Sequence, residues 1–458
     1  MRSLSWSKFL FVAAVVLLVN ALLPNLLFRN TPLRVWKQIL AVILFIALLM
    51  DYRYVTASFE NRSFRTIKRL ILLAIIIMMF QSIFTFTKGF SLIRILFAEY
   101  MYLGGIPFLI LPLIFIYQGK TQQFFTFISI LGIVLGVGLT LDHFYGIFEM
   151  FSFGEATYLW ASKRGESAIA RASFLFESPT AISYFNNFCL ICLLYKIFTK
   201  AGQKKTKLIY ITGMLILLIG TTLTASRQVI VTALFIVTMG CLVGVVSQKD
   251  AVSGLLAFCL LLFFIPLAGG MIYKITTQSI QFYDILRRIG DIGGSLGERG
   301  QLWKEGLALF GFDNMARWMI GQGIGDAMGS HVAPTETVHH HYESALFMTF
   351  HEGGWPLLFV VYWPTIATAF ILLKQPKSYL KILLLLYLPC VWGLSVIAPG
   401  ILHPTAQMCI YFTLGMAVVL PHITESEQPM LLMEYYDEMA YENWPETEEL
   451  PPVYQEYL

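Results

Sequence analysis

Apolar runs of roughly twenty residues recur along the whole chain and alternate with shorter polar stretches. An α-helix of that length spans the hydrocarbon core of a bilayer, because each residue adds ~1.5 Å to a ~30 Å path. The pattern therefore predicts about twelve membrane helices. They are expected near residues 9–28, 36–50, 70–87, 95–117, 122–141, 174–198, 208–225, 228–246, 253–272, 343–373, 382–397 and 405–421.

The run 343–373 differs from the others because it carries two adjacent glycines and two prolines, Gly353, Gly354, Pro356 and Pro364. Proline removes a helical hydrogen bond, and glycine tolerates conformations that end a helix. We expect this helix to be broken, or to begin before it enters the lipid.

Composition agrees with the pattern. Hydrophobic residues make up 57% of the chain and charged residues only 13%, against ~25% charged in a typical soluble domain. The mean hydropathy is +0.69. These values predict an all-α polytopic membrane protein.

All six cysteines lie inside apolar runs. A disulfide framework or a zinc site would need them in polar loops at ligand spacing. We interpret them as packing residues. They are Cys189, Cys192, Cys241, Cys259, Cys390 and Cys409.

Basic residues indicate the orientation of the chain in the membrane. They concentrate between the second and third runs, in "TKAGQKKTK" (199–207) and in "KQPKSYLK" (374–381), which fall on one side of the predicted bundle. Short loops rich in Lys and Arg remain in the cytoplasm. We expect a multi-pass membrane protein with both termini in the cytoplasm.

This orientation divides the chain into four parts. Residues 1–272 hold the first nine helices, 273–342 form a long, partly helical extracytoplasmic loop, and 343–423 hold the last three helices. Residues 424–458 form a cytoplasmic tail with ten acids and no Lys or Arg. Such a composition is typical of a solvated, disordered extension, and a docking tail for a cytoplasmic partner is the alternative.

Arg227 lies in "TTLTASRQ", a polar hairpin between two apolar runs. A charge near the membrane core costs roughly 2.5–3.5 kcal/mol, so it normally faces a cavity, although a long side chain can also reach the interface. The guanidinium group is always charged and presents a planar fork of donors that matches phosphate oxygens. Thr224 and Ser226 could add hydroxyl donors to such an anion site.

Other arginines are predicted on the same outer side: Arg171, Arg287, Arg288, Arg299 and Arg317. Arginines converging on one cavity would suit a diphosphate whose lipid tail stays in the bilayer, as in a polyprenyl-diphosphate-linked sugar. No "DxD" carboxylate pair stands out in the outer loops. We expect the arginines to stabilise the leaving diphosphate without a metal or other cofactor.

Three consecutive histidines, His339, His340 and His341, close the long loop. A neutral imidazole can take the proton of an attacking sugar hydroxyl, and we expect His340 or His341 to do so. If the segment is helical, His340 shares a face with His351. A structural role, or a metal site that includes His331, are the alternatives.

The stretch "IGQGIGDAMGSH" precedes the histidines, and its glycines permit a tight turn near a ligand. It resembles a dinucleotide-binding fingerprint only superficially, because no strand–helix context surrounds it. We expect no nucleic-acid partner. Upstream, residues 299–310 space apolar residues as in an amphipathic helix on the membrane surface.

Five motifs in this order resemble the O-antigen ligase and polymerase superfamily of bacterial cell-surface polysaccharide assembly, over roughly residues 165–375. They are "RASFLFESP" at 171–179, "TASR" at 224–227, "RGQLW" at 299–303, "GQGIG" at 321–325, and the histidines followed by "EGG" at 352–354.

The resemblance implies a membrane glycosyltransferase of the C-type, with many helices and an outer catalytic cavity. It implies undecaprenyl-diphosphate-linked glycan as donor, membrane lipid around it, and chain-length regulators or other assembly proteins as partners. Arg227 and Arg299 match family arginines that bind the diphosphate, and Arg171 matches a further one. His340 or His341 matches the loop histidine that activates the acceptor.

The chain also departs from the family pattern. "HHHYESAL" stands where "HNxxL" is usual, and "FLFESPT" stands where "GxFxNPN" is common. These differences favour a polysaccharide polymerase over a ligase that transfers finished glycan to a lipid or wall acceptor. A transporter or flippase is the alternative from another class, and it would carry charges on both sides of the membrane midplane.

Overall fold

The computed structural model describes residues 62–117, 120–145, 179–199, 204–224, 226–247, 315–327 and 344–443, together with residues 12, 16, 300 and 304. Within these ranges every regular element is a helix, and no strand is present. Eight helical segments there are long and apolar enough to cross a membrane. The protein is therefore an α-helical polytopic membrane protein.

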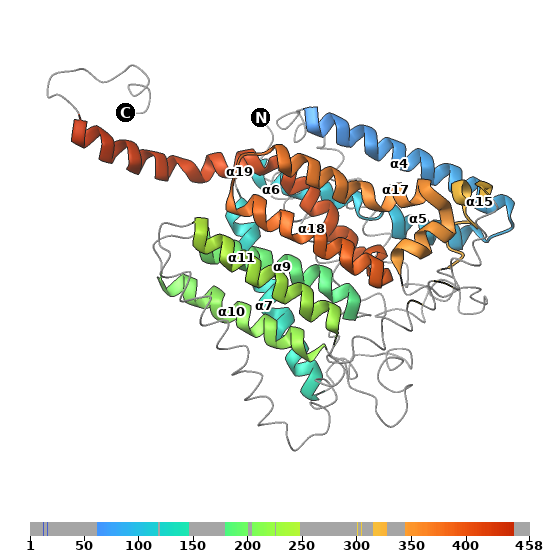
Figure 1. Ribbon diagram of the computed structural model, residues 1–458, viewed down its shortest axis with the longest axis horizontal. Coiled ribbons are helices and arrows are strands. Elements are labelled where there is room, and N and C mark those ends of the chain that lie inside the picture. Colours follow the sequence, from blue (N-terminus) through green and yellow to red (C-terminus); the bar gives the residue numbers. More distant parts are fainter. Residues whose placement is uncertain are drawn as a thin grey trace.

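Short connections link many of the helices, so that neighbours in sequence run antiparallel (Figure 1). In chain order they are α4 (Arg62–Thr87), α5 (Leu92–Leu103), η3 (Ile106–Leu109), α6 (Ile110–Tyr117), α7 (Thr121–Tyr145), α9 (Pro179–Thr199), α10 (Lys204–Leu223), α11 (Arg227–Ser247), α15 (Met315–Ile320), α17 (Ala345–Lys374), α18 (Tyr379–Ile397), η6 (Pro399–Leu402) and α19 (Pro404–Asn443).

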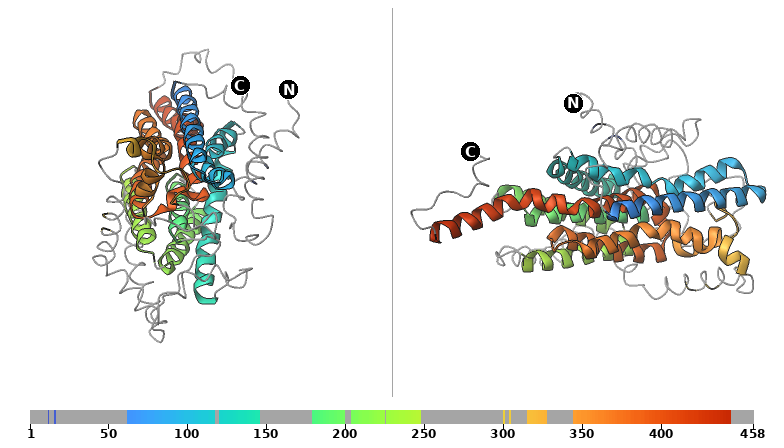
Figure 2. Two further views of the ribbon diagram at one scale, coloured as in Figure 1. Left: turned by 90° about the vertical axis from the view of Figure 1, so that its right-hand side faces the viewer. Right: turned by 90° about the horizontal axis from the view of Figure 1, so that it is seen from above.

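The two ends of the bundle are distinct. One end, here called the loop end, collects the α4–α5 turn, the α10–α11 turn, α15 and the N-termini of α9, α17 and α19 (Figures 1 and 2). The opposite end, the tail end, holds the N-termini of α4 and α10 and the continuation of α19. All the polar clusters described below lie at the loop end.

Burial separates central from peripheral helices. Of the residues in the apolar stretch of α9, 94% are buried within the protein. The share is 89% for the span Pro404–Ile423 and only 22% for α4. α4 exposes large apolar side chains along its length, among them Leu72, Ile76, Phe80 and Ile83. Soluble proteins rarely expose apolar patches of this extent, so this face of α4 is suited to contact with lipid.

The eight candidate spans confirm eight of the predicted runs, those between residues 70 and 225 and between 343 and 421. The predicted run 228–246 corresponds to α11, whose apolar stretch, Gln228–Gly244, is shorter than a full span. The predicted runs 9–28, 36–50 and 253–272 lie outside the described residues, except that residues 12 and 16 are helical. A total of twelve spans therefore remains a prediction.

The predicted break in the tenth run is confirmed. At Gly354 the backbone of α17 leaves the helical region, with φ 61° and ψ −154°. The part after the break, 355–374, is about 30 Å long at ~1.5 Å per residue, which equals the thickness of a hydrocarbon core. Trp318, Phe350 and the exposed Trp355 form edge-to-face pairs beside the break. Tryptophan favours the membrane interface, so the surroundings of the break are suited to a membrane boundary.

The acidic tail differs from its prediction. α19 continues without interruption to Asn443, and Figure 1 shows this extension leaving the bundle at the tail end. Residues 424–443 are thus helical, not disordered. The reason is local: eleven of these twenty residues are Leu, Met, Glu or Ala, all strong helix formers.

Candidate functional site

The loop 321–327 forms the tight turn that its glycines predict. Gly321, Gly323 and Gly325 have φ values of 71°, 123° and 83°. The turn packs directly against the break in α17. The contact is so close that a Cβ atom added to Gly321 would lie 2.5 Å from the backbone of Glu352. Only glycine allows so close an approach in this conformation.

This loop caps the broken helix. A helix that ends leaves its last carbonyl groups without helical partners, which is costly near lipid. Here Gln322 N–H donates to the carbonyl of His351 (2.8 Å) and Gly323 N–H to that of Glu352 (2.9 Å). From α4, Gln81 Nε2 donates to the carbonyl of Gly353 (3.1 Å). Three successive carbonyls at the break are therefore satisfied.

The helix in turn accepts hydrogen bonds from the loop, through the carboxylate of Glu352. This side chain is fully buried. Its Oε2 accepts from Gly325 N–H (2.9 Å) and from the hydroxyl of Tyr102 (2.7 Å), and its Oε1 accepts from Ala327 N–H (2.9 Å). The loop and the helix thus satisfy each other's backbone groups.

The remaining amides of the loop are also paired. Ile324 N–H donates to Thr85 Oγ1 on α4 (2.9 Å), and Asp326 N–H donates to the carbonyl of Gly323 (3.3 Å). Every backbone N–H from Gln322 to Ala327 consequently has an acceptor. A backbone held at every donor has little freedom to move.

Basic side chains hold the carbonyl groups of the same loop. Arg94 on α5 is buried; its Nε donates to Gly325 O (2.8 Å) and its Nη2 to Asp326 O (3.0 Å). Lys88 Nζ donates to Gln322 O (2.9 Å). We call the loop 321–327, with the side chains that hold it, the loop clamp. Those side chains are Gln81, Thr85, Lys88, Arg94, Tyr102, His351 and Glu352.

Asp326 adds two ionic contacts within the loop clamp. Its carboxylate lies 2.9 Å from His351 Nε2 and 3.7 Å from Arg94 Nη2. His351 is only 3% exposed and Glu352 is 0% exposed. His351, which shares a helical face with His340 in the sequence pattern, is engaged with Asp326. The contacts of the loop clamp thus hold chain segments together.

The predicted site residues are only partly described. Arg227 is the first residue of α11 and Arg317 lies in α15, so the backbones of both are at the loop end. Gly300 and Lys304, within the predicted amphipathic helix 299–310, are both helical. The other predicted site residues lie outside the described residues. They are Arg171, Arg287, Arg288, Arg299, His340 and His341, and the same holds for His331 and His339.

The α10–α11 turn places Arg227 at a helix N-terminus. The first helical hydrogen bond of α11 joins Ile230 N–H to the carbonyl of Ser226 (3.1 Å). The amides before Ile230 therefore have no intrahelical acceptor, as at any helix start. The hydroxyl of Thr224 donates to the carbonyl of Thr221 (2.7 Å) and accepts from Ser226 N–H (3.3 Å). Its hydroxyl hydrogen is thus used within the turn in this structure.

A group of polar side chains lies beneath this turn, between α9, α10 and α11. Thr221 Oγ1 lies 2.9 Å from Asn186 Oδ1, and Asn187 Nδ2 donates to Thr232 Oγ1 (2.9 Å). Asn186 and Asn187 are fully buried. We call Asn186, Asn187, Thr221, Gln228 and Thr232 the polar patch.

Three buried atoms of the polar patch have no hydrogen-bond partner within the described ranges: Asn186 Nδ2, Asn187 Oδ1 and Gln228 Oε1. Buried polar atoms are normally paired, so such a group marks a place for water or a ligand. The polar patch is not among the sites predicted from the sequence, although "YFNNF" (184–188) puts two asparagines in an apolar run, which is a signal for it.

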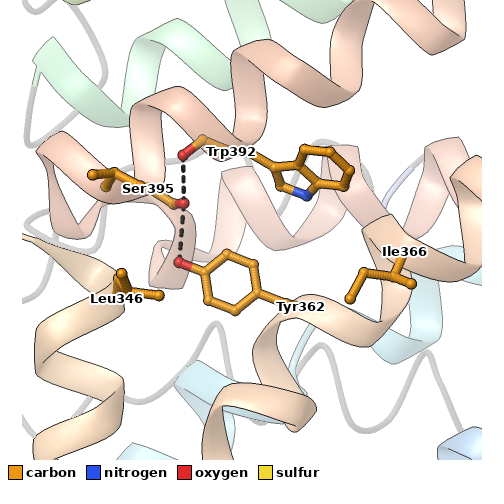
Figure 3. A pocket seen from close by; sticks show the side chains of 6 residues that line it. Leu346, Tyr362, Ile366, Trp392 and Ser395 are labelled. Carbon is orange, nitrogen blue, oxygen red and sulfur yellow. Dashed lines mark hydrogen bonds between the residues drawn. The ribbon is translucent and has the colours of Figure 1, made fainter.

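A separate, shallow cavity of about 290 Å³ lies between α17 and α18, near the loop end (Figure 3). The Tyr362 hydroxyl donates to Ser395 Oγ (3.0 Å), which donates to Trp392 O (2.7 Å). Its polar groups are thus paired with each other, and the remaining lining is apolar. The lining residues are Leu346, Tyr362, Ile366, Trp392, Ser395 and Val396.

Within the described ranges, no group of three or more His, Cys, Asp or Glu side chains is arranged to hold a metal ion. Five of the cysteines, Cys189, Cys192, Cys241, Cys390 and Cys409, are buried free thiols, as expected of packing residues.

No protein-family model matches this chain, and no curated protein matches it in sequence. The function is therefore argued from the geometry at the loop end and from the motifs in the sequence.

Proposed function

We propose that this protein is a membrane glycosyltransferase, a polysaccharide polymerase, whose active site lies at the loop end and faces the extracytoplasmic side of the bacterial cytoplasmic membrane. It transfers a growing glycan from a polyprenyl diphosphate, undecaprenyl diphosphate by resemblance, to a hydroxyl of an incoming lipid-linked repeat unit. The resemblance to the O-antigen ligase and polymerase superfamily supplies the reaction, and the geometry of the loop end supports it.

One observation carries the proposal. Arg227, at the start of α11, lies at the same end of the bundle as Ala327 and Ser344, the described residues on either side of the histidine segment 328–343. α18 packs against both α11 and α17. With interaxial distances of about 8–10 Å, the N-termini of α11 and α17 are separated by about two helix widths. A diphosphate group bound by Arg227 and an acceptor hydroxyl bound by the histidine segment can therefore both lie at the loop end.

Arg227 is suited to the diphosphate for two reasons. Its guanidinium group offers a planar set of donors to phosphate oxygens, and the adjacent helix start offers backbone amides to an anion. In the proposed reaction, the bond between the anomeric carbon and the diphosphate breaks, and negative charge develops on the departing phosphate oxygen. Arg227 and Arg299 stabilise that charge, and Arg171, Arg287, Arg288 and Arg317 contribute to binding the carrier.

His340 or His341 takes the proton of the acceptor hydroxyl as it attacks the anomeric carbon. The arginines neutralise the leaving group, so the reaction as proposed needs no metal or other cofactor. Membrane lipid surrounds the bundle, and chain-length regulators or other assembly proteins are the expected partners.

Basic side chains support the orientation. The tail end carries Arg62, Arg65, Lys68 and Arg69 on α4, and "KQPKSYLK" joins α17 to α18. An excess of Lys and Arg in short loops marks the cytoplasmic side. The loop end is then extracytoplasmic, and the acidic extension of α19 is cytoplasmic.

The test is turnover of a lipid-linked repeat unit by the protein in proteoliposomes, with product length measured on a gel. Arg227→Ala should reduce the rate by about 10²–10³-fold, the usual effect of removing a donor to a developing anion. Arg227→Lys should retain more activity, because it keeps the charge and loses the planar fork. The control is Arg69→Ala, an exposed arginine at the tail end, with wild-type turnover.

The products also separate the related functions. Chains of increasing length indicate a polymerase, and a single transfer of finished glycan to a lipid or wall acceptor indicates a ligase. Full activity of Arg227→Ala would remove the diphosphate site, and transport of intact carrier without bond breakage would indicate a transporter or flippase.

A further inference from the structure

We propose that Glu352 is a positioning residue of this site: its carboxylate fixes the loop 321–327 and thereby the start of the segment that carries the histidines. The inference rests on the proposed function for its catalytic consequence. Its structural half, the immobility of the loop, stands independently.

The first argument is the number of donors that converge on this one side chain. Two oxygens accept three hydrogen bonds, from Gly325 N–H, Ala327 N–H and the Tyr102 hydroxyl, at 2.7–2.9 Å. An ionised carboxylate offers about four acceptor positions and no donor. A glutamine of the same size has one oxygen, and its NH₂ group would face at least one of these N–H groups. Only a carboxylate satisfies all three donors at once.

The second argument is the position of these contacts in the chain. Ala327 is the last described residue before the histidine segment, and Glu352 holds its amide directly. The same carboxylate belongs to α17, whose first residue, Ala345, follows that segment. One side chain thus ties the start of the segment to the helix that ends it. A displacement of Ala327 would move the segment's origin, and a shift of about 1 Å in a reacting group can cost about 10²-fold in rate.

The third argument is that the tie is braced from other helices. Tyr102 and Arg94 come from α5, and Thr85 comes from α4. The sequence separations are large: 250 residues between Tyr102 and Glu352, and 231 between Arg94 and Gly325. The carboxylate is therefore fixed relative to the bundle and does not move with the loop alone.

The experiment compares full-length wild type, Glu352→Gln, Glu352→Asp and Tyr102→Phe in proteoliposomes, with two readouts. The first is amide hydrogen exchange, followed by mass spectrometry of peptides covering 321–327 and, as an internal control, α9. In Glu352→Gln the exchange of the loop peptide should rise about tenfold, while α9 is unchanged. Tyr102→Phe removes one donor and leaves both amides paired, so its loop exchange should rise by a smaller factor, about threefold.

The second readout is steady-state turnover of lipid-linked repeat unit. In Glu352→Gln, kcat should fall about 10²-fold, while KM for the donor changes less than about threefold, because the diphosphate is held from α11. Glu352→Asp keeps two acceptor oxygens and should recover part of kcat. A general loss of structure would instead change kcat, KM and α9 exchange together.

The outcomes distinguish the two proposals. Unchanged loop exchange in Glu352→Gln would contradict the positioning role. Raised exchange with wild-type kcat would also contradict it and leave the proposed function intact. Full activity of Arg227→Ala would overturn the proposed function whatever the exchange result. If Glu352→Gln fails to fold, Tyr102→Phe decides: raised loop exchange with a lower kcat supports the inference, and wild-type values in both overturn it.

Discussion

The loop clamp and the polar patch both lie at the loop end, yet they treat buried polar groups in opposite ways. In the loop clamp, every backbone N–H from Gln322 to Ala327 has an acceptor, and Glu352 accepts three hydrogen bonds. In the polar patch, Asn186 Nδ2, Asn187 Oδ1 and Gln228 Oε1 have no partner among the described residues. The backbone donors of the first region are thus fully paired there, and the side chains of the second are not.

The difference indicates which buried polar groups serve the fold and which are suited to a ligand. A fully paired network is rigid and defines one conformation, whereas unpaired buried groups destabilise the protein until a bound molecule pairs with them. The loop clamp has a minor exception, since Gln81 Oε1 is unpaired. The contrast predicts that substitutions in the loop clamp reduce stability strongly and that substitutions in the polar patch reduce it little.

Gly354→Ala should give the largest effect. Its φ and ψ of 61° and −154° are available only to glycine, and a Cβ atom would lie 2.0 Å from the carbonyl oxygen of Trp318. Strain and overpacking together should cost about 3–5 kcal/mol. Thermal unfolding of the detergent-solubilised protein measures the loss. The matched control is Gly393→Ala in α18, with no atom within 4 Å of the added Cβ, which should stabilise by about 0.5–1 kcal/mol.

Arg94→Met should come next, with a loss of about 2–4 kcal/mol. Methionine keeps the length of the side chain but leaves the carbonyls of Gly325 and Asp326 without their donors. Arg69→Met, exposed on α4, should change the unfolding free energy by less than about 0.5 kcal/mol. Equal transition temperatures for the two variants would show that the clamp does not hold the loop.

Thr232→Val tests the pair that Asn187 and Thr232 form in the polar patch. Losing the acceptor of Asn187 Nδ2 should cost about 1 kcal/mol. Thr222→Val, exposed on α10, is the control, with a change below about 0.5 kcal/mol. A loss as large as that of Arg94→Met would remove the distinction between the two regions.

Asn186→Leu should have the smallest effect on stability, within about 0.5 kcal/mol or slightly stabilising. The substitution removes an amide whose nitrogen has no partner among the described residues. The Thr221 hydroxyl loses its contact with Asn186 Oδ1 but keeps the carbonyl of Leu217 at 2.6 Å. Turnover of the lipid-linked substrate should nevertheless fall about tenfold, since the patch lies beneath Arg227. A loss of 2 kcal/mol or more would mean that the asparagine serves the fold and not a ligand.

The sequence predicts those features that depend on neighbouring residues. Hydropathy locates the spans because a membrane helix is one continuous apolar run, and the glycines at 321–325 and 353–354 predict a tight turn and a helix break. It misplaces the ends where helices continue into polar sequence, as in α4, which begins at Arg62, and in α19, which extends to Asn443.

The sequence does not predict which residues meet across the bundle. Arg94 is a single arginine in the apolar stretch "LIRILF", and nothing near it indicates that it holds a loop some 230 residues away. Glu352 was noticed as part of "EGG", but its three donors come from Tyr102 and from the loop 321–327. Such contacts depend on how helices pack, and that information is not local. The arrangement of the predicted arginines and histidines around a diphosphate remains a prediction.

The break at Gly354 also has an electrical consequence. A continuous α17 would have a single positive end, at Ala345. Because the helix ends at the break and restarts after Gly354, a negative end and a positive end, each of about half an elementary charge, both lie next to Glu352. The N–H groups of Gln322, Gly323 and Gln81, which pair with the carbonyls of residues 351–353, offset the negative end beside a carboxylate that is entirely removed from water.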